Sequence, residues 1–571
     1  MGAGYVAPWQ NLSCNSNGVD GAAYLQMQSK MSINITKIPA TGPWSPLHHP
    51  VFRMLWIASI FSNIGSWMHE VGAGWLMTSL APSPLMVALV QAATTSPVFL
   101  LALPAGALAD IVDRRRYLIA TQVWMMIVAA ILGVLTLTGL TTAPLLLVFT
   151  FALGMGTAMM MPAWGAVTPE LVPRAELHAA IGLNTIGMNV SRAIGPALAG
   201  LIIATAGPGV VFILNAISFL AVIAALKSWQ RPARESELPA ERLFGAVRAG
   251  LRYARHSPEL RAVLTRGVAF FVFASASWAL LPLIVRQELN SGPGIYGLFL
   301  ACVGIGAIAG ALLLPRVHGR VSRDKIVAGA TVLYTLAMLA LAHSGNVYAA
   351  GAAMLVTGVA WLSVVSSLMT ATQTALPGWV RARGLAFFWV AFTGGMAAGS
   401  ALWGQIASWI GIPAALTVAA VGALAGIAAT WRYRIGLHDV ADLSPSLHWA
   451  TPMVADELEM DSGPVMVTVE YQIDPARIHE FAQIMHSIRR VRRRDGAFMW
   501  ELFNDIEDPG RFVECFMVES WLEHLRQHER VTVADRDVSE KARAFHLGSE
   551  PPKVTHLVAG SIGRPSAGKS G

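Results

Sequence analysis

The chain has 571 residues, of which 54% are hydrophobic and 13% are charged, whereas globular proteins average about 25% charged residues. The deficit lies in long stretches without any charge, so the composition excludes a wholly soluble protein and predicts a multi-pass membrane protein with a soluble tail. The net charge is +7, but the basic residues lie in turns beside apolar runs, which indicates membrane topology rather than nucleic-acid binding.

The cysteines and the first residues of the chain give no indication of a metal site, a cofactor site or a cleavable signal. Cys14, Cys302 and Cys515 lie far apart without metal-ligand spacing, and no nucleotide-binding fingerprint is present, so we expect no disulfide framework, metal or cofactor. Residues 1–48 are polar and lack the basic segment and apolar core of a cleavable signal, so we expect a disordered leader. We expect translation to start at either Met1 or Met31.

Charge-free runs bounded by turn residues predict about twelve transmembrane helices, since about 20 apolar residues cross a bilayer. They lie near residues 51–78, 85–109, 117–138, 144–166, 178–206, 209–229, 262–287, 295–315, 325–343, 347–372, 383–409 and 413–431. Turns after odd-numbered spans contain no Lys or Arg, whereas turns after even-numbered spans carry basic clusters such as Arg114–Arg116. Because cytoplasmic loops retain basic residues, we expect a cell (inner) membrane protein with both termini in the cytoplasm.

The turn between the second and third spans carries a recognisable motif. It reads Gly106-Ala-Leu-Ala-Asp110-Ile-Val-Asp113-Arg114-Arg115-Arg116. This order resembles the corresponding loop of major facilitator transporters, whose pattern runs roughly G-x-L-A-D-R-x-G-R-R/K. Ile111 stands where the family has arginine, and Asp113 where it has glycine. The resemblance implies an all-α membrane fold of twelve helices, in two six-helix bundles that rock around a midplane cavity.

Two further features indicate two related halves. A basic segment over 231–261 divides the spans into two groups of six and includes a helix expected along the membrane surface. The stretch Gly195-Pro-Ala-Leu-Ala-Gly200 recurs 204 residues later as Gly399-Ser-Ala-Leu-Trp-Gly404, and a second pair of segments shares this offset. We therefore expect an N-terminal bundle over 49–230 and a C-terminal bundle over 262–434.

The composition changes after the last span to that of a soluble α+β domain. A linker over 435–462 is expected to precede a cytoplasmic domain over 463–562, with a short tail over 563–571. Hydrophobic periodicity predicts the order strand, helix, strand, strand, helix, strand, with the last helix over 521–530 and the last strand over 553–559. This order is ferredoxin-like, and the domain looks like those related to antibiotic-biosynthesis monooxygenases.

In the major facilitator family, the aspartate of the motif helps to latch the two bundles together on the cytoplasmic side. The resemblance gives six candidate latch residues: Gly106, Asp110, Arg114, Arg115, Arg381 and Arg383. Asp110 would face Arg381, Arg383 or the positive N-terminus of the eleventh span. The alternative is a solvated turn carboxylate.

We expect Asp110→Asn to keep membrane insertion but to lower transport sharply, because an amide offers no charge to the latch. Immunoblotting of membranes checks insertion, and a flux assay checks transport. Normal flux by the variant would remove the latch hypothesis.

Charged residues inside spans are candidates for function, because an ionised group at the bilayer centre costs roughly 2.5–3.5 kcal/mol. Arg192 in the fifth span is a candidate for binding an anionic substrate or tuning a carboxylate, or else a structural arginine paired with a neighbouring helix. His69 and Glu70 lie in the first span, and Glu70 is a candidate carrier of a coupling proton because burial favours the neutral carboxyl. The alternative is an outer-rim pair with Arg286.

Gly195, Pro196 and Gly200 resemble the glycine-proline motif of exporter-type members of the family, and together with Gly399 and Gly404 they are candidates for close helix packing. This motif and the basic turn are most similar to the enterobactin-exporter group, the transmembrane secretion effectors. The resemblance implies proton-coupled efflux, by antiport, of a small organic molecule such as a siderophore, drug or metabolite. The fourth span lacks the arginine that many proton antiporters of the family carry.

The soluble tail leaves two other function classes open, namely a membrane-anchored monooxygenase-like enzyme and a ligand-sensing or dimerisation module. His524 and His528 have the spacing of a metal-binding pair on a helix, but no third ligand is evident and a solvated pair is the favoured interpretation. A basic run would contact anionic lipid or form a solvated helix end. It comprises Arg489, Arg490, Arg492, Arg493 and Arg494.

Overall fold

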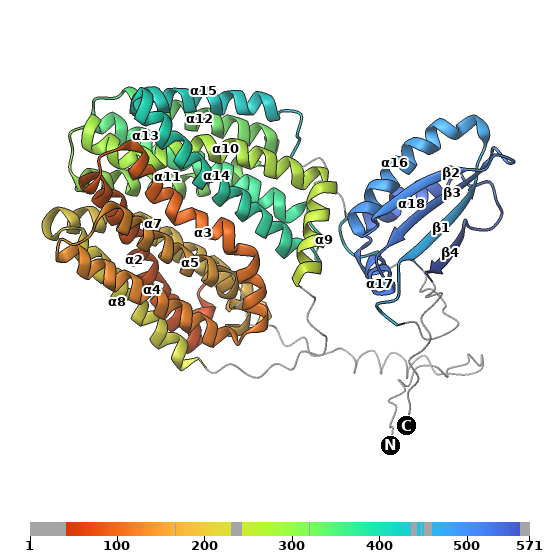
Figure 1. Cartoon of the computed structure of the whole chain (residues 1–571), viewed down its shortest axis with the longest axis horizontal. Helices are drawn as coiled ribbons and strands as arrows, with labels where there is room; N and C mark the ends of the chain where they lie inside the picture. The colour runs from red at the N-terminus through yellow and green to blue at the C-terminus, as the bar shows by residue number, and fades with distance from the viewer. Residues whose placement is uncertain are drawn as a thin grey trace, which may run out of the picture.

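The computed structural model describes residues 42–165, 167–229, 243–318, 320–377, 379–435, 442–446, 448–449 and 459–559. They form a helical bundle and a small α+β domain (Figure 1). Most of the predicted leader, much of the two predicted linkers and the predicted tail after residue 562 lie outside the described residues. Within the leader, Ser45–His48 form a short 3-10 helix, η1.

The helical part consists of two sets of long helices. The first set contains α2 (Pro50–Leu80), α3 (Pro84–Ile111), α4 (Arg114–Leu137), α5 (Ala143–Gly165), the short α6 (Thr168–Leu171) and η2 (Arg174–Glu176), α7 (Leu177–Ala206) and α8 (Pro208–Ser228). After α9 (Leu243–His256), the second set contains α10 (Pro258–Leu283) with its π-helical continuation η3 (Ile284–Glu288), α11 (Pro293–His318), α12 (Arg323–His343), α13 (Val347–Thr374), α14 (Arg381–Ile410) and α15 (Ile412–Thr430). We call these sets the N-half and the C-half.

Proline and glycine set many of the helix boundaries. Five of the long helices begin with proline, whose fixed φ suits a first turn and whose missing N–H costs nothing there. Gly207 ends α7 with a φ of 81°, and Gly411 ends α14 with a φ of 83°. Such left-handed values favour glycine. The two glycines lie 204 residues apart, so the sequence repeat has the same backbone turn in both halves.

Eleven helices among the described residues are long and apolar enough to cross a membrane, from Pro84–Ala102 in α3 to Ile412–Thr430 in α15. The remaining long helix, α2, has 31 residues and packs against α7 and α8. The N-half and C-half meet where α3 packs against α14 and α7 packs against α11 (Figure 1). These crossings position the site described below.

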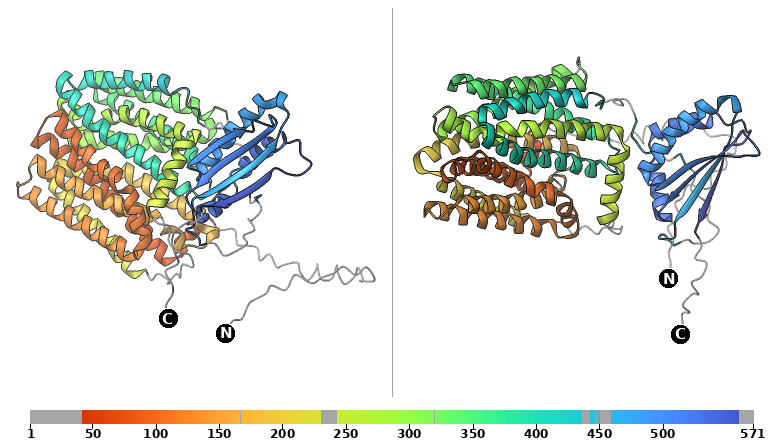
Figure 2. Two further views of the ribbon diagram at one scale, coloured as in Figure 1. Left: turned by 45° about the vertical axis from the view of Figure 1, so that its right-hand side comes forward. Right: turned by 45° about the horizontal axis from the view of Figure 1, so that its top comes forward.

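The C-terminal domain is a four-stranded antiparallel sheet with helices on one face (Figure 2). Its elements are β1 (Val465–Gln472), η4 (Pro475–Arg477), α16 (Ile478–Asp495), β2 (Met499–Asn504), β3 (Arg511–Val518), α17 (Trp521–Arg530), α18 (Val533–Arg543) and β4 (Lys553–Val558). The strand order is β2-β3-β1-β4. Alternate residues of β1 are buried, and Phe481 of α16 packs with Phe512 of β3 in the core.

Two interpretations of polar residues in this domain were wrong. Arg492 and Arg494 are neither lipid-facing nor solvated, because Arg492 lies on the buried stripe of α16 and the side chain of Arg494 is only 15% exposed. Arg492 pairs with Glu514 at 2.9 Å, while Arg494 pairs with the neighbouring aspartate at 2.8 Å. His524 is not solvated either, since its side chain is only 1% exposed.

Candidate functional site

Four helices enclose a small cavity between the two halves. Trp67 and Glu70 of α2 and Gln91 of α3 line it from the N-half, while Trp278 of α10 and Tyr296 of α11 line it from the C-half. Its volume is about 30 Å³, which is enough for about two water molecules. Among the described side chains that line the cavity, Glu70 is the one that is acidic. The predicted coupling residue therefore lies where the halves meet.

Arg192 approaches the same site from α7. Its guanidinium lies 5.5 Å from the ring centroid of Trp67, and its charge interacts with that of Glu70. The Nε atom of Arg192 is buried and has no hydrogen-bond partner within the described part of the chain. Trp67 is therefore a neighbour of both Glu70 and Arg192, because it lines the cavity with Glu70 and packs against the guanidinium of Arg192.

The structure separates His69 from this cavity. Its side chain is 7% exposed and lies 4.6 Å from the ring of Phe212 on α8, inside the N-half. Neither ring nitrogen has a hydrogen-bond partner among the described residues. The geometry therefore favours Glu70 over His69 as a residue that a substrate or proton can reach.

Arg286 ties the halves together at the helix ends beyond the cavity. It donates hydrogen bonds to the hydroxyl oxygens of Thr78 and Ser79 at 2.8 and 2.6 Å, and its guanidinium lies 5.6 Å from the ring centroid of Trp75. Gln287 donates to the Pro82 carbonyl oxygen at 3.4 Å. The partners of Arg286 given by the structure are hydroxyl groups rather than Glu70. These contacts join the two halves at this end of the interface, which we call the far side.

The repeated glycines lie at helix crossings that match between the two halves. A Cβ added at Gly195 would lie 2.7 Å from the Trp67 Cβ, and one at Gly399 would meet Val272 of α10, so each glycine packs within its own half. A Cβ at Gly200 would lie 2.7 Å from the carbonyl oxygen of Pro293 on α11, and one at Gly404 would lie 2.5 Å from the Ala88 Cβ on α3. These two glycines therefore bring the halves together.

The carbonyl oxygen of Pro196 completes the α7–α11 crossing. It would meet a Cβ added at Gly297, which would also lie 2.9 Å from the Gly200 Cα. Small residues on both helices thus allow their backbones to touch.

The arginines of the basic turn make contacts within the N-half. Arg114 at the start of α4 pairs with Glu170 of α6. Arg115 donates to the carbonyl oxygens of Leu226 and Lys227, at 2.9 and 2.6 Å, and so caps the C-terminus of α8. Asp113 accepts a hydrogen bond from a backbone N–H of the first turn of α4 at 2.8 Å.

The other latch candidates lie apart from these pairs. Gly106 and Asp110 are in the last turns of α3, and the side chain of Asp110 lies outside the described atoms. Arg381 donates to the Leu376 carbonyl oxygen at 3.4 Å, within its own loop. Arg383 packs against α9, since a Cβ at Gly250 would lie 3.3 Å from its Cβ. The latch stays a prediction.

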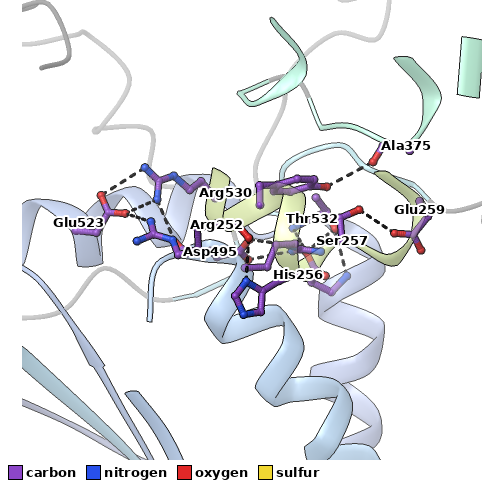
Figure 3. A network of polar contacts seen from close by, with 12 residues as sticks. Arg252, His256, Ser257, Glu259, Ala375, Asp495, Glu523, Arg530 and Thr532 are labelled. Carbon is purple, nitrogen blue, oxygen red and sulfur yellow. Dashed lines mark hydrogen bonds and ion pairs between the residues drawn. The ribbon is translucent and has the colours of Figure 1, made fainter. Parts of the chain in front are cut away.

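The C-terminal domain contacts the helical part through α9 and the loop before α14 (Figure 3). Glu523 of α17 accepts hydrogen bonds from Arg252 of α9 at 2.8 Å and from Arg530 at 2.6 Å. The Arg530 guanidinium lies 4.6 Å from the ring centroid of Trp379. Tyr253 donates to the Ala375 carbonyl oxygen at 3.4 Å, and burial raises the pKa of its phenol, which keeps it a donor.

We expect Arg252→Ala to loosen this contact while the domain stays folded, because Glu523 keeps Arg530 as its partner. A hydrogen bond to a charged group contributes about 1.5–3 kcal/mol, so amide hydrogen exchange in α9 should rise by about tenfold or more. Arg255→Ala is the matched control, since Arg255 is exposed on the same helix. Equal exchange in both variants would mean that the ion pair does not hold the domain.

Sequence reasoning identified Glu70 and Arg192 but missed most of their surroundings. Trp67, Trp278 and Tyr296 lie in apolar spans where an aromatic residue is unremarkable, and no spacing connects them. Glu170, the partner of Arg114, was likewise missed, although an acidic residue in a turn beside a basic cluster is a usable signal.

Comparisons with known proteins match this architecture. A family model described as transmembrane secretion effector matches residues 41–565. The staphyloferrin A transporter of Staphylococcus aureus is 26% identical over 285 residues, which cover 49% of this chain and 71% of that protein. The enterobactin exporter EntS of Salmonella typhimurium is 27% identical over 334 residues, which cover 58% of this chain and 79% of that protein.

Solved structures of transporters share the fold. A bacterial homologue of the human lysosomal transporter Spinster, in an inward-facing and occupied conformation, has a TM-score of 0.55 at 15% identity and covers 69% of this chain and 98% of its own. A bacterial homologue of the iron transporter ferroportin, in an inward-facing state, has a TM-score of 0.52 at 14% identity and covers 67% and 98%. Since the family model spans both the helical part and the C-terminal domain, the chain belongs to the transmembrane secretion effector family of major facilitator transporters, whose members are multi-pass membrane proteins rather than enzymes.

Proposed function

We propose that the protein is a proton-coupled efflux transporter for a small organic molecule, built from twelve transmembrane helices with both termini in the cytoplasm. The observation that carries this proposal is the position of Glu70, in a cavity to which both halves contribute. Helix α2 is the twelfth span, because it packs between other spans and supplies Glu70. The names of two relatives, staphyloferrin A transporter and enterobactin exporter, support a small organic substrate, such as a siderophore, drug or metabolite.

The mechanism is alternating access, in which the halves over 49–230 and 262–434 rock around the cavity. The hydrogen bonds of Arg286 and the α7–α11 glycine crossing close the far side in this conformation. Opening the far side requires these contacts to break. Protonation of Glu70 removes its charge beside Arg192 and is the event that we couple to this change.

We infer that the C-terminal domain is ferredoxin-like, with α18 as an additional helix, and that it regulates the transporter rather than catalysing a reaction. Its ion pair with α9 supports this role, because it connects the domain to the segment between the halves. The prediction of a dimer through this domain stays a prediction.

Uptake by inverted membrane vesicles tests the transport proposal. Vesicles containing the protein are supplied with a panel of siderophores, antibiotics and other amphipathic metabolites, with and without an imposed pH gradient. We expect at least one compound to accumulate against its gradient, and the accumulation to vanish when an ionophore removes the proton gradient. Accumulation only in right-side-out vesicles would instead indicate uptake, and accumulation indifferent to the ionophore would exclude proton coupling.

A further inference from the structure

Three histidines of the C-terminal domain come together although the sequence shows only two of them as a pair. His524 and His528 lie one turn apart on the same face of α17, and His556 on β4 faces them. Each offers a ring nitrogen, and these three atoms lie within 4.8 Å of one another. The ring centroids of His524 and His556 are 4.8 Å apart.

The spacing of the two nitrogens on α17 suits a shared metal ion. The Nε2 atoms of His524 and His528 are 3.3 Å apart. In a tetrahedral site with Zn–N bonds of about 2.0–2.1 Å, two ligand nitrogens are about 3.3–3.4 Å apart. His556 offers the third ring nitrogen, and a change of its ring orientation brings that nitrogen closer to the other two.

The surroundings keep these rings neutral. Burial lowers the pKa of His524 to about 3 and that of His528 to about 4, and the pKa of His556 is lowered for the same reason. A neutral imidazole carries the lone pair that binds a metal. Arg492, whose charge also lowers the pKa of His528, is itself paired with Glu514, which offsets its repulsion of a cation.

Unpaired polar atoms also mark this place. The Nδ1 atom of His524 and both side-chain amide atoms of Gln527 are buried without a hydrogen-bond partner in the described part of the domain. Such groups are rare in proteins, and the Nδ1 atom stays available to an outer partner because the proposed ligand atom of His524 is Nε2. Gln527 lies against His524 and can orient its ring, as outer partners of metal ligands do.

We propose that His524, His528 and His556 bind one divalent transition-metal ion of the Zn²⁺ class, with a fourth position for water or another ligand. The ring of Trp449 covers the site from one side, with its centroid 5.0 Å from that of His528. Glu523, which holds α9, directly precedes His524 on α17. The metal therefore fixes the helix through which the domain contacts the membrane part.

The test uses the full-length chain, purified in detergent and freed of metal by chelation. Titration with Co²⁺ should give one saturable site per chain with the visible absorption of a tetrahedral ion, and Zn²⁺ should displace it. We expect His528→Gln and His556→Gln to weaken binding by about a hundredfold or more, since loss of even an outer partner costs about 10–100-fold. His486→Gln is the matched control, because His486 is exposed on α16 of the same domain.

X-ray absorption of the Zn²⁺-loaded wild type keeps the test valid even where a variant fails to fold. It should report three imidazole nitrogens at about 2.0–2.1 Å and no sulfur ligand. The proposal is overturned by the absence of saturable binding, by unchanged affinity in both ligand variants, or by sulfur in the coordination shell. In the first case the histidines are a hydrogen-bonded cluster.

Discussion

Replacement of Glu70 by glutamine should abolish uphill transport while leaving the protein folded and in the membrane. Glutamine has nearly the same shape and fills the same cavity wall, but it cannot release a proton. A membrane potential supplies about 2.3 kcal/mol per charge per 100 mV, which sustains a concentration ratio of about fifty. We expect Glu70→Gln to lose this ratio and the pH dependence of transport.

Reconstituted vesicles distinguish a coupling role from a structural one. In Glu70→Gln, substrate exchange at equal concentrations on both sides should continue, because exchange needs no net proton movement. Glu288→Gln is the control, since Glu288 is exposed near the far side. A Glu70→Gln variant that still accumulates substrate when a pH gradient is imposed would exclude Glu70 as the proton carrier.

Gly297→Val should produce the second large effect, by separating the halves on the far side. The new Cβ would meet the Pro196 carbonyl oxygen and lie 2.9 Å from the Gly200 Cα, and neither backbone atom can yield locally because both belong to α7. Overpacking costs about 1–3 kcal/mol, which shifts a two-state equilibrium by about 5–150-fold. We expect transport to fall by about tenfold or more.

Gly294→Val is the matched control, because a Cβ at Gly294 meets nothing within 4 Å although the residue lies on the same helix. A cysteine at Val87, which is buried in the cavity lining, reports opening of the far side through its reaction with a water-soluble thiol reagent. Gly297→Val should speed this reaction and Gly294→Val should not. Equal rates would show that the crossing does not keep the halves closed.

Most of the membrane spans were predictable because their signals lie in the sequence pattern itself. Long apolar runs, prolines at first turns and the 204-residue repeat can all be read from the chain itself. Gly207 and Gly411, which are 204 residues apart, also share the same left-handed backbone conformation. In the C-terminal domain, alternation gave the strands. Helix α18 was missed, although Thr532 and Asp535 form a capping box at its start and supplied a usable signal.

Contacts between distant segments could not be predicted in the same way. His556 lies 28 residues after His528, on a strand whose register decides which side chains face α17. Arg252 meets Glu523 across 271 residues, and neither residue has a spacing that marks the other. Burial also differs between residues of one basic run. Arg492 forms an ion pair in the core, whereas Arg490, two residues before it, is exposed.

The contacts of the C-terminal domain also determine which half of the membrane part it would move with. Its ion pairs reach Arg248 and Arg252 of α9, and Arg530 stacks on Trp379 of the loop before α14, so these contacts connect it to the C-half side. In the proposed rocking motion, the C-terminal domain therefore moves together with the C-half. A partner that bound the sheet face opposite the helices and immobilised the domain would therefore hinder movement of the C-half but not of the N-half.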